Sequence, residues 1–200
     1  RVAVLDSGVF CAHADIAPNL ILAESMSFVP GEAVCNTLAS QSSHGTHVAG
    51  TILAPDNGIG TIGVAPEAKL IAVKVLSAAT GGGSFAGILQ GIVYAADHGA
   101  DVINMSLGVT GGLPKGNGPG QNQVSELINA TKRAVQYARR QNATVIASAG
   151  NDGRDLNHDD NQMAFPAEVE GVISIAATAP VGWAKAPTST FLDNRASYTN

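Results

Sequence analysis

The sequence predicts an α/β fold with a mostly parallel central sheet flanked by helices. Short apolar runs of strand length alternate with helical patterns along the whole chain. Several of these runs are apolar almost throughout, which is typical of strands that are covered on both faces. Alternation of this kind favours a parallel sheet with right-handed crossover connections. The expected strands span residues 2–5, 21–28, 70–76, 101–107, 144–148 and 172–177.

Three helices are expected between these strands. The first follows His44 and is rich in small residues, so that it can pack closely on a sheet, and Ser42 or Ser43 can cap its free amides. The second spans about 84–98 and carries its apolar residues on one side. The third spans about 122–140 and repeats apolar residues at helical spacing.

Composition and charge limit the classes of protein to consider. A chain of 200 residues with 45% hydrophobic content supports one sizeable core, so we expect one domain over residues 1–200. Eleven basic and sixteen acidic side chains give a net charge of −5, and no Lys/Arg cluster forms, which argues against nucleic acid as a partner. No run is long enough to span a bilayer and no signal peptide is found. The abrupt start and end suggest a piece of a longer protein.

Cys11 and Cys35 are the only cysteines. They could form one disulfide, which would fit an exported protein. Two free thiols fit nearly as well, because a sequence does not show whether the two Cα atoms approach closely enough. Neither a CxxC motif nor a Cys/His metal spacing is present.

Polar residues gather where the predicted strands end, and in open α/β sheets ligands bind beyond these carboxyl ends. Asp6 ends the first strand, and Asn151 follows the strand at 144–148 in a glycine-flanked turn. His44 lies in the first turn of a helix, whose positive end favours a neutral, basic ring. A carboxylate such as Asp6 could fix its tautomer, and Asn151 could donate to an oxyanion. Taken singly, Asp6 and His44 are more often capping or packing residues, and Asn151 is also reasonable as a turn residue.

Four motifs in this order resemble those of the subtilisin-like serine proteases, the subtilases. They are Val4-Leu5-Asp6-Ser7-Gly8-Val9, Ser43-His44-Gly45-Thr46-His47-Val48-Ala49-Gly50, Val102-Ile103-Asn104-Met105-Ser106-Leu107-Gly108 and Ser148-Ala149-Gly150-Asn151. The resemblance covers essentially the whole chain. It implies a three-layer subtilisin-like fold, incomplete at both ends.

The resemblance also implies roles for individual residues. Asp6 would orient His44, His44 would deprotonate a serine, and Asn151 would donate to the tetrahedral intermediate together with a backbone N–H. A polypeptide substrate would lie as an extended strand between two backbone segments and beside a pocket wall. The first segment is Gly81, Gly82 and Gly83, the second is Ser106, Leu107 and Gly108, and the wall is Ser148, Ala149 and Gly150.

One part of the family's pattern is missing. Nothing matches the Gly-Thr-Ser-Met-Ala-type segment that carries the nucleophile, so the serine is expected beyond residue 200. We therefore expect residues 1–200 alone to be inactive and the full-length protein to be a serine endopeptidase. The alternative is a pseudoprotease domain that binds peptides without cleaving them. A nucleotide-binding domain is a more distant alternative, because the first strand is not followed by a phosphate loop.

A calcium site is a further implication of the resemblance. The stretch Asp56-Asn57-Gly58-Ile59-Gly60-Thr61 resembles the family's calcium loop. Asp15 would supply a carboxylate, Asn57 a side-chain oxygen, and Ile59 and Thr61 backbone carbonyls, which are hard ligands that suit calcium. Zinc between His44 and His47 is disfavoured, because no third ligand is suitably spaced. We further expect a monomer that is secreted or held in the cell envelope, and the resemblance allows for a propeptide as a partner.

Overall fold

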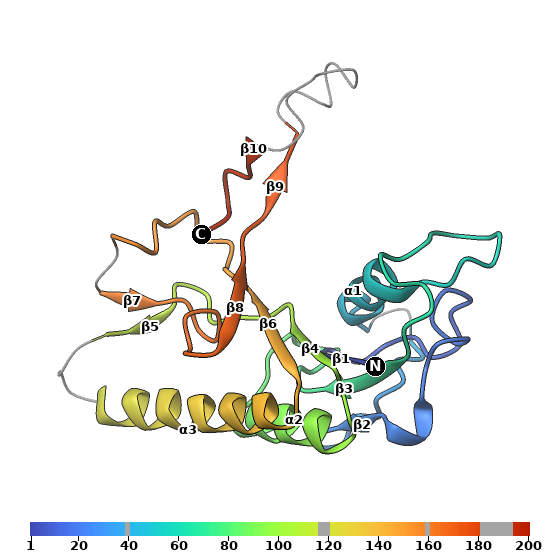
Figure 1. Ribbon diagram of the computed structural model, residues 1–200, viewed down its shortest axis with the longest axis horizontal. Helices are drawn as coiled ribbons and strands as arrows, with labels where there is room; N and C mark the ends of the chain where they lie inside the picture. Colours follow the sequence, from blue (N-terminus) through green and yellow to red (C-terminus); the bar gives the residue numbers. More distant parts are fainter. Residues whose placement is uncertain (39–40, 116–120, 159–160, 181–193) are drawn as a thin grey trace.

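The computed structural model describes residues 1–38, 41–115, 121–158, 161–180 and 194–200. Its centre is a six-stranded sheet of order β2-β3-β1-β4-β6-β8 in which all neighbours are parallel (Figure 1). The predicted α/β fold with a parallel sheet is therefore confirmed. These strands are β1 (Val2–Asp6), β2 (Met26–Ser27), β3 (Leu70–Lys74), β4 (Val102–Met105), β6 (Thr144–Ser148) and β8 (Val172–Ile175).

Helices cover both faces of the sheet and make it the middle of three layers. The helix α1 (His44–Leu53) lies on one face, and α2 (Phe85–Asp97) and α3 (Gln121–Arg140) lie on the other (Figure 1). The side chains of β1 alternate accordingly. Ala3 and Leu5 join the cluster that contains α2 and α3, whereas Val2 and Val4 join the cluster that contains α1. All three helices were expected at these places.

The segment at 21–28 differs from the predicted strand. It forms a short 3-10 helix, η1 (Leu22–Glu24), followed by the two-residue strand β2. Ser25 makes the turn, because its Oγ donates to the Ile21 carbonyl at 2.9 Å and accepts from the Ala72 N–H at 3.0 Å. The Ala72 N–H of β3 thus bonds to a side-chain oxygen of the neighbouring segment instead of to a backbone carbonyl. An apolar pattern does not reveal that a side chain competes with the backbone in this way.

Four two-residue strands lie outside the main sheet and were not predicted. The first pair is antiparallel and places a glycine-rich stretch against the segment before Phe165. Within it Leu113 is buried. The second pair is antiparallel as well. The pairs are β5 (Leu113–Pro114) with β7 (Gln162–Met163), and β9 (Thr178–Ala179) with β10 (Asn194–Arg195).

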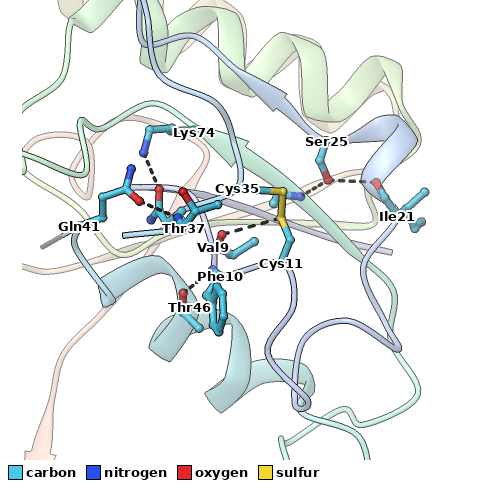
Figure 2. Close-up of a disulfide and its surroundings, with 12 residues drawn as sticks. Val9, Phe10, Cys11, Ile21, Ser25, Cys35, Thr37, Gln41, Thr46 and Lys74 are labelled. Carbon is cyan, nitrogen blue, oxygen red and sulfur yellow. Dashed lines mark hydrogen bonds between the residues drawn. A yellow bond between two sulfur atoms is a disulfide. The ribbon is translucent and has the colours of Figure 1, made fainter. Parts of the chain in front are cut away.

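Cys11 and Cys35 form a disulfide, with their Cα atoms 5.3 Å apart (Figure 2). Of the two alternatives left open by the sequence, the structure therefore has the bonded one. The bond adds a covalent link to an isolated parallel bridge between Val9 and Cys35, so the segment around Cys35 is held beside the end of β1. Within the described parts of the chain, no helix combines the length and the apolar character needed to cross a bilayer.

Candidate active site

Asp6 and His44 meet at the carboxyl end of β1. The His44 Nδ1 atom lies 2.9 Å from both Oδ1 and Oδ2 of Asp6. The Asp6 side chain is 1% exposed, whereas the His44 side chain is 55% exposed. Because the carboxylate can only accept, we assign the ring proton to Nδ1, where it donates to Asp6. The other ring nitrogen, Nε2, is then left with a lone pair that can accept a proton.

The first turn of α1 is capped by serines from two different segments. Ser43 is the N-cap by position, but its side chain makes no capping hydrogen bond. Instead the His44 N–H donates to Ser42 Oγ at 3.2 Å, and the Gly45 N–H donates to Ser7 Oγ at 3.3 Å. Of the two predicted caps, Ser42 is thus the one that bonds to the helix. Ser7, which follows Asp6 directly, was not anticipated in this role.

A cleft of about 730 Å³ opens beside this pair and is lined by Asp6, His44 and Asn151 together. Of the nine residues expected to contact a substrate, Ala149 alone does not line it, since its side chain is buried and 4% exposed. Of the three residues expected to form the pocket wall, Ser148 and Gly150 therefore line the cleft and Ala149 does not. The other eight line the cleft: Gly81, Gly82, Gly83, Ser106, Leu107, Gly108, Ser148 and Gly150.

The backbone that follows β4 enters the cleft. The pairing of β4 with β6 ends at Met105, so the segment 106–108 leaves the sheet at the cleft. Two aromatic side chains that the sequence analysis did not single out also line it. Phe85 and Phe165 contact each other edge to face, with ring centroids 5.6 Å apart. They add an apolar wall, and only the fold brings them together, since they lie 80 positions apart.

The loop that carries Asn151 is held by Asn200, which the sequence analysis also missed. The Asn200 Oδ1 atom accepts from the N–H groups of Asp152 at 3.1 Å and Arg154 at 2.9 Å. Its Nδ2 donates to the carbonyl of Ala149 at 3.0 Å. One side-chain amide therefore bonds on both sides of Asn151 and fixes the loop, while the Asn151 side chain itself is exposed at the cleft.

The predicted calcium ligands lie in two segments that meet away from the cleft. Asp15 is 6% exposed, its Oδ2 accepts from the Thr61 N–H at 3.2 Å, and its Oδ1 is buried without a partner. Asn57 Oδ1 accepts from the Ile59 N–H at 3.1 Å. Among the described residues, no three His, Cys, Asp or Glu side chains are placed so that they could hold a metal ion together, so a cation here would also need amide and carbonyl oxygens. The orphaned Asp15 oxygen fits a hard cation.

Known proteins resemble this chain over most of its length. Residues 1–198 match the profile of the Subtilase family. Subtilisin E of Bacillus subtilis (strain 168) is 41% identical over 177 residues, covering 88% of this chain and 40% of the relative. The major intracellular serine protease of the same organism is 36% identical over 177 residues, covering 88% of this chain and 50% of the relative. The chain therefore spans about half the length of the curated relatives it matches.

A solved structure agrees with this relationship. The S41 psychrophilic protease superposes with a TM-score of 0.73 at 30% identity, over 99% of this chain and 57% of that chain. The sheet order, the four motifs in sequence and the match over residues 1–198 point to one conclusion. The chain belongs to the subtilase family.

Proposed function

We propose that this chain is the Asp-His part of a serine endopeptidase whose nucleophilic serine lies outside residues 1–200. The observation that carries the proposal is the buried Asp6 carboxylate at 2.9 Å from His44 Nδ1, in a cleft that also contains Asn151. Membership of the subtilase family supports the same reaction class.

The mechanism follows from these positions. His44 Nε2 takes the proton of the serine hydroxyl as the serine oxygen attacks the peptide carbonyl, and Asp6 stabilises the resulting imidazolium. The Asn151 NH₂ group donates to the developing oxyanion. His44 then gives the proton to the leaving amine. Water deacylates the enzyme through the same base, while the peptide is held as a strand between residues 81–83 and 106–108.

Peptide cleavage by the full-length protein tests this function. We expect turnover of an internally quenched peptide, and His44→Ala should lower kcat roughly 10⁴- to 10⁶-fold, because the base is lost. His47→Ala, one turn along the same helix and outside the cleft, is the matched control and should cleave normally. Turnover that survives in His44→Ala would refute the proposal. Peptide binding without turnover by the wild type would favour the pseudoprotease.

Residues 1–200 alone should not turn over the same peptide. In the part of the chain that the structure describes, no serine hydroxyl is hydrogen-bonded to the His44 ring. We therefore expect His44 in residues 1–200 to have no nucleophilic serine whose proton it could accept.

We also propose that the protein works outside the cytosol, secreted or held in the cell envelope. The support is the disulfide between Cys11 and Cys35, since such bonds persist in oxidising compartments. Family membership does not decide the location, because one relative is named as intracellular. Polypeptide substrates, a propeptide and a monomeric state belong to the same proposal.

Calcium is proposed as a structural cofactor. Asp15 and Asn57 would supply side-chain oxygens, and Ile59 and Thr61 backbone carbonyls, with the unpartnered Asp15 Oδ1 as the supporting observation. When bound, the cation would neutralise a buried carboxylate and link two loops. It has no part in the peptide cleavage proposed above.

A further inference from the structure

Lys74 is a buried cation directly behind the proposed catalytic aspartate. Its side chain is 0% exposed, and the parallel register of β1 and β3 pairs it with Asp6. A buried ammonium is costly unless it is paired and hydrogen-bonded. Lys74 Nζ has three partners: it donates to the Ser7 carbonyl at 2.6 Å and to Asn36 Oδ1 at 3.1 Å, and lies 3.1 Å from Glu32 Oε2.

Ser7 is the residue through which Lys74 reaches the Asp-His pair. The Ser7 N–H donates to Asp6 Oδ1 at 2.7 Å, and Ser7 Oγ accepts from the Gly45 N–H in the first turn of α1. Its carbonyl is the group bonded to Lys74. The conformation of this one residue therefore affects both the aspartate and the start of the helix that carries the histidine.

Asn36 extends the same support to the residues before His44. Its Nδ2 donates to the carbonyls of Ser7 at 2.9 Å and Ser42 at 3.1 Å. Ser42 in turn accepts from the His44 N–H through its Oγ. A buried amide, itself bonded to Lys74, thus ties the turn after Asp6 to the loop that leads into α1.

The position of Asn36 is itself fixed. Its N–H donates to the Val9 carbonyl at 2.8 Å, and the preceding residue, Cys35, is bonded to Cys11. Figure 2 shows Lys74 beside the short segment that contains Cys35 and Thr37. Asn36 is therefore anchored to residues 9–11, the segment that follows β1, by backbone hydrogen bonds and by the disulfide of its neighbour.

Glu32 completes the network as a carboxylate. Ser77 Oγ donates to its Oε1 at 2.5 Å, and the Ala78 N–H donates to its Oε2 at 2.9 Å. These two donors and the Lys74 ammonium lower the pKa of Glu32 from 4.5 to about 2. At neutral pH Lys74 therefore faces a charged partner, and removing Lys74 would leave several polar groups without a donor.

We propose that Lys74 is a positioning residue for the Asp6–His44 pair, acting through the Ser7 carbonyl and the Asn36 amide. It touches neither the cleft nor the His44 ring. The proposal rests on the proposed peptidase function. A purely structural lysine would affect only how readily the protein unfolds. A positioning lysine also changes the reaction in molecules that are fully folded.

Lys74→Met in the full-length protein removes the charge and the donors while keeping a long unbranched side chain. Assayed well below the melting temperature of the variant, it should lower kcat roughly 10- to 100-fold with KM little changed, because small displacements of catalytic groups are costly. Lys69→Met is the matched control. Lys69 directly precedes β3, and its Nζ donates to Asn19 Oδ1 at 2.7 Å instead of to Ser7 or Asn36. Lys74→Arg, which keeps charged donors, should recover part of the lost kcat.

If Lys74→Met does not fold, Asn36→Ala is used instead, and it too should lower kcat while KM changes little. A folded variant that melts earlier but keeps the wild-type kcat would overturn the proposal. A second readout does not need peptidase activity. Ring ¹⁵N spectra at a pH where His44 is neutral should place the proton on Nδ1 in the wild type and in Lys69→Met, and give mixed tautomers in Lys74→Met.

The two readouts separate the two claims. A wild-type protein that cleaves no peptide refutes the peptidase function, and the tautomer of His44 then decides the role of Lys74 alone. An unchanged Nδ1 tautomer in a folded Lys74→Met protein refutes the positioning role even if peptides are cleaved.

Discussion

Gly45 shows how closely the residues around Asp6 and His44 are packed. A Cβ atom at position 45 would lie 2.3 Å from the Gly8 carbonyl oxygen and 3.0 Å from Asp6 Oδ1. Contacts of that length do not occur with backbone atoms, so any larger side chain would push α1 away from β1. The absence of a side chain beside His44 is therefore what allows its ring to reach the aspartate.

At the residue scale, Asn151→Ala in the full-length protein tests the oxyanion role. We expect kcat to fall roughly 10²- to 10³-fold with KM nearly unchanged, because the amide would donate to charge that develops only in the transition state. Asn157→Ala, an exposed asparagine six positions further along the same region and outside the cleft, is the control. A kcat within twofold of the wild type would remove Asn151 from the mechanism.

At the scale of elements, the segment 32–36 joins the end of β3 to the end of β1. Glu32 reaches the residues that follow β3, and Asn36 reaches those that follow β1, while Lys74 on β3 bonds to both. A segment without regular secondary structure thus links the ends of two neighbouring strands. Its side-chain contacts replace the backbone ladder that stops at these positions.

The Glu32 contacts predict a contribution to stability that depends on pH. The folded-state pKa of Glu32, about 2, is below the ordinary value of 4.5, so its stabilisation is complete above pH 4.5 and is lost as the pH falls toward 2. Allowing for partial exposure, Glu32→Gln should lower the free energy of unfolding by about 2 kcal/mol at neutral pH.

Urea unfolding at several pH values checks this, in the His44→Ala background so that self-cleavage is avoided. The wild-type and Glu32→Gln curves of stability against pH should converge near pH 2. Glu67→Gln, at an exposed position, should run parallel to the wild type. If the Glu32→Gln curve also runs parallel to the wild-type curve, ionisation of the Glu32 carboxyl contributes nothing to stability.

At the scale of the whole molecule, the proposed calcium site joins two loops that are far apart in the sequence. A cation that binds only the folded state at 100 times its Kd should raise the free energy of unfolding by about 2.7 kcal/mol. Thermal melts of EDTA-treated protein with added calcium measure this as a higher Tm. Magnesium, which demands a tighter octahedral shell, should raise it far less. Asp15→Asn should abolish the calcium effect, and an equal rise in that variant would contradict the site.

Much of the molecule could be predicted because the signals are local. Apolar runs and helical spacing depend on neighbouring residues, so five of the six strands and all three helices were placed correctly within a few residues. Asp6, His44 and Asn151 lie where strands or a helix begin or end, and the sheet brings such positions to one edge. The strand expected at 21–28 was wrong because the Ser25 hydroxyl bonds to the backbone of β3, and an apolar pattern contains no information on such a bond.

The order of the elements, the edge of the sheet that bears the chemistry and the family could all be read from local motifs. The disulfide between Cys11 and Cys35, the burial of Ala149 and the hydrogen bond from Lys74 to the Ser7 carbonyl became visible only in the folded molecule. A lysine within the apolar run 70–76 was a signal, but its partners could not be read from it. They depend on which strand lies beside β3 and in what register, and that is set by packing across the whole sheet.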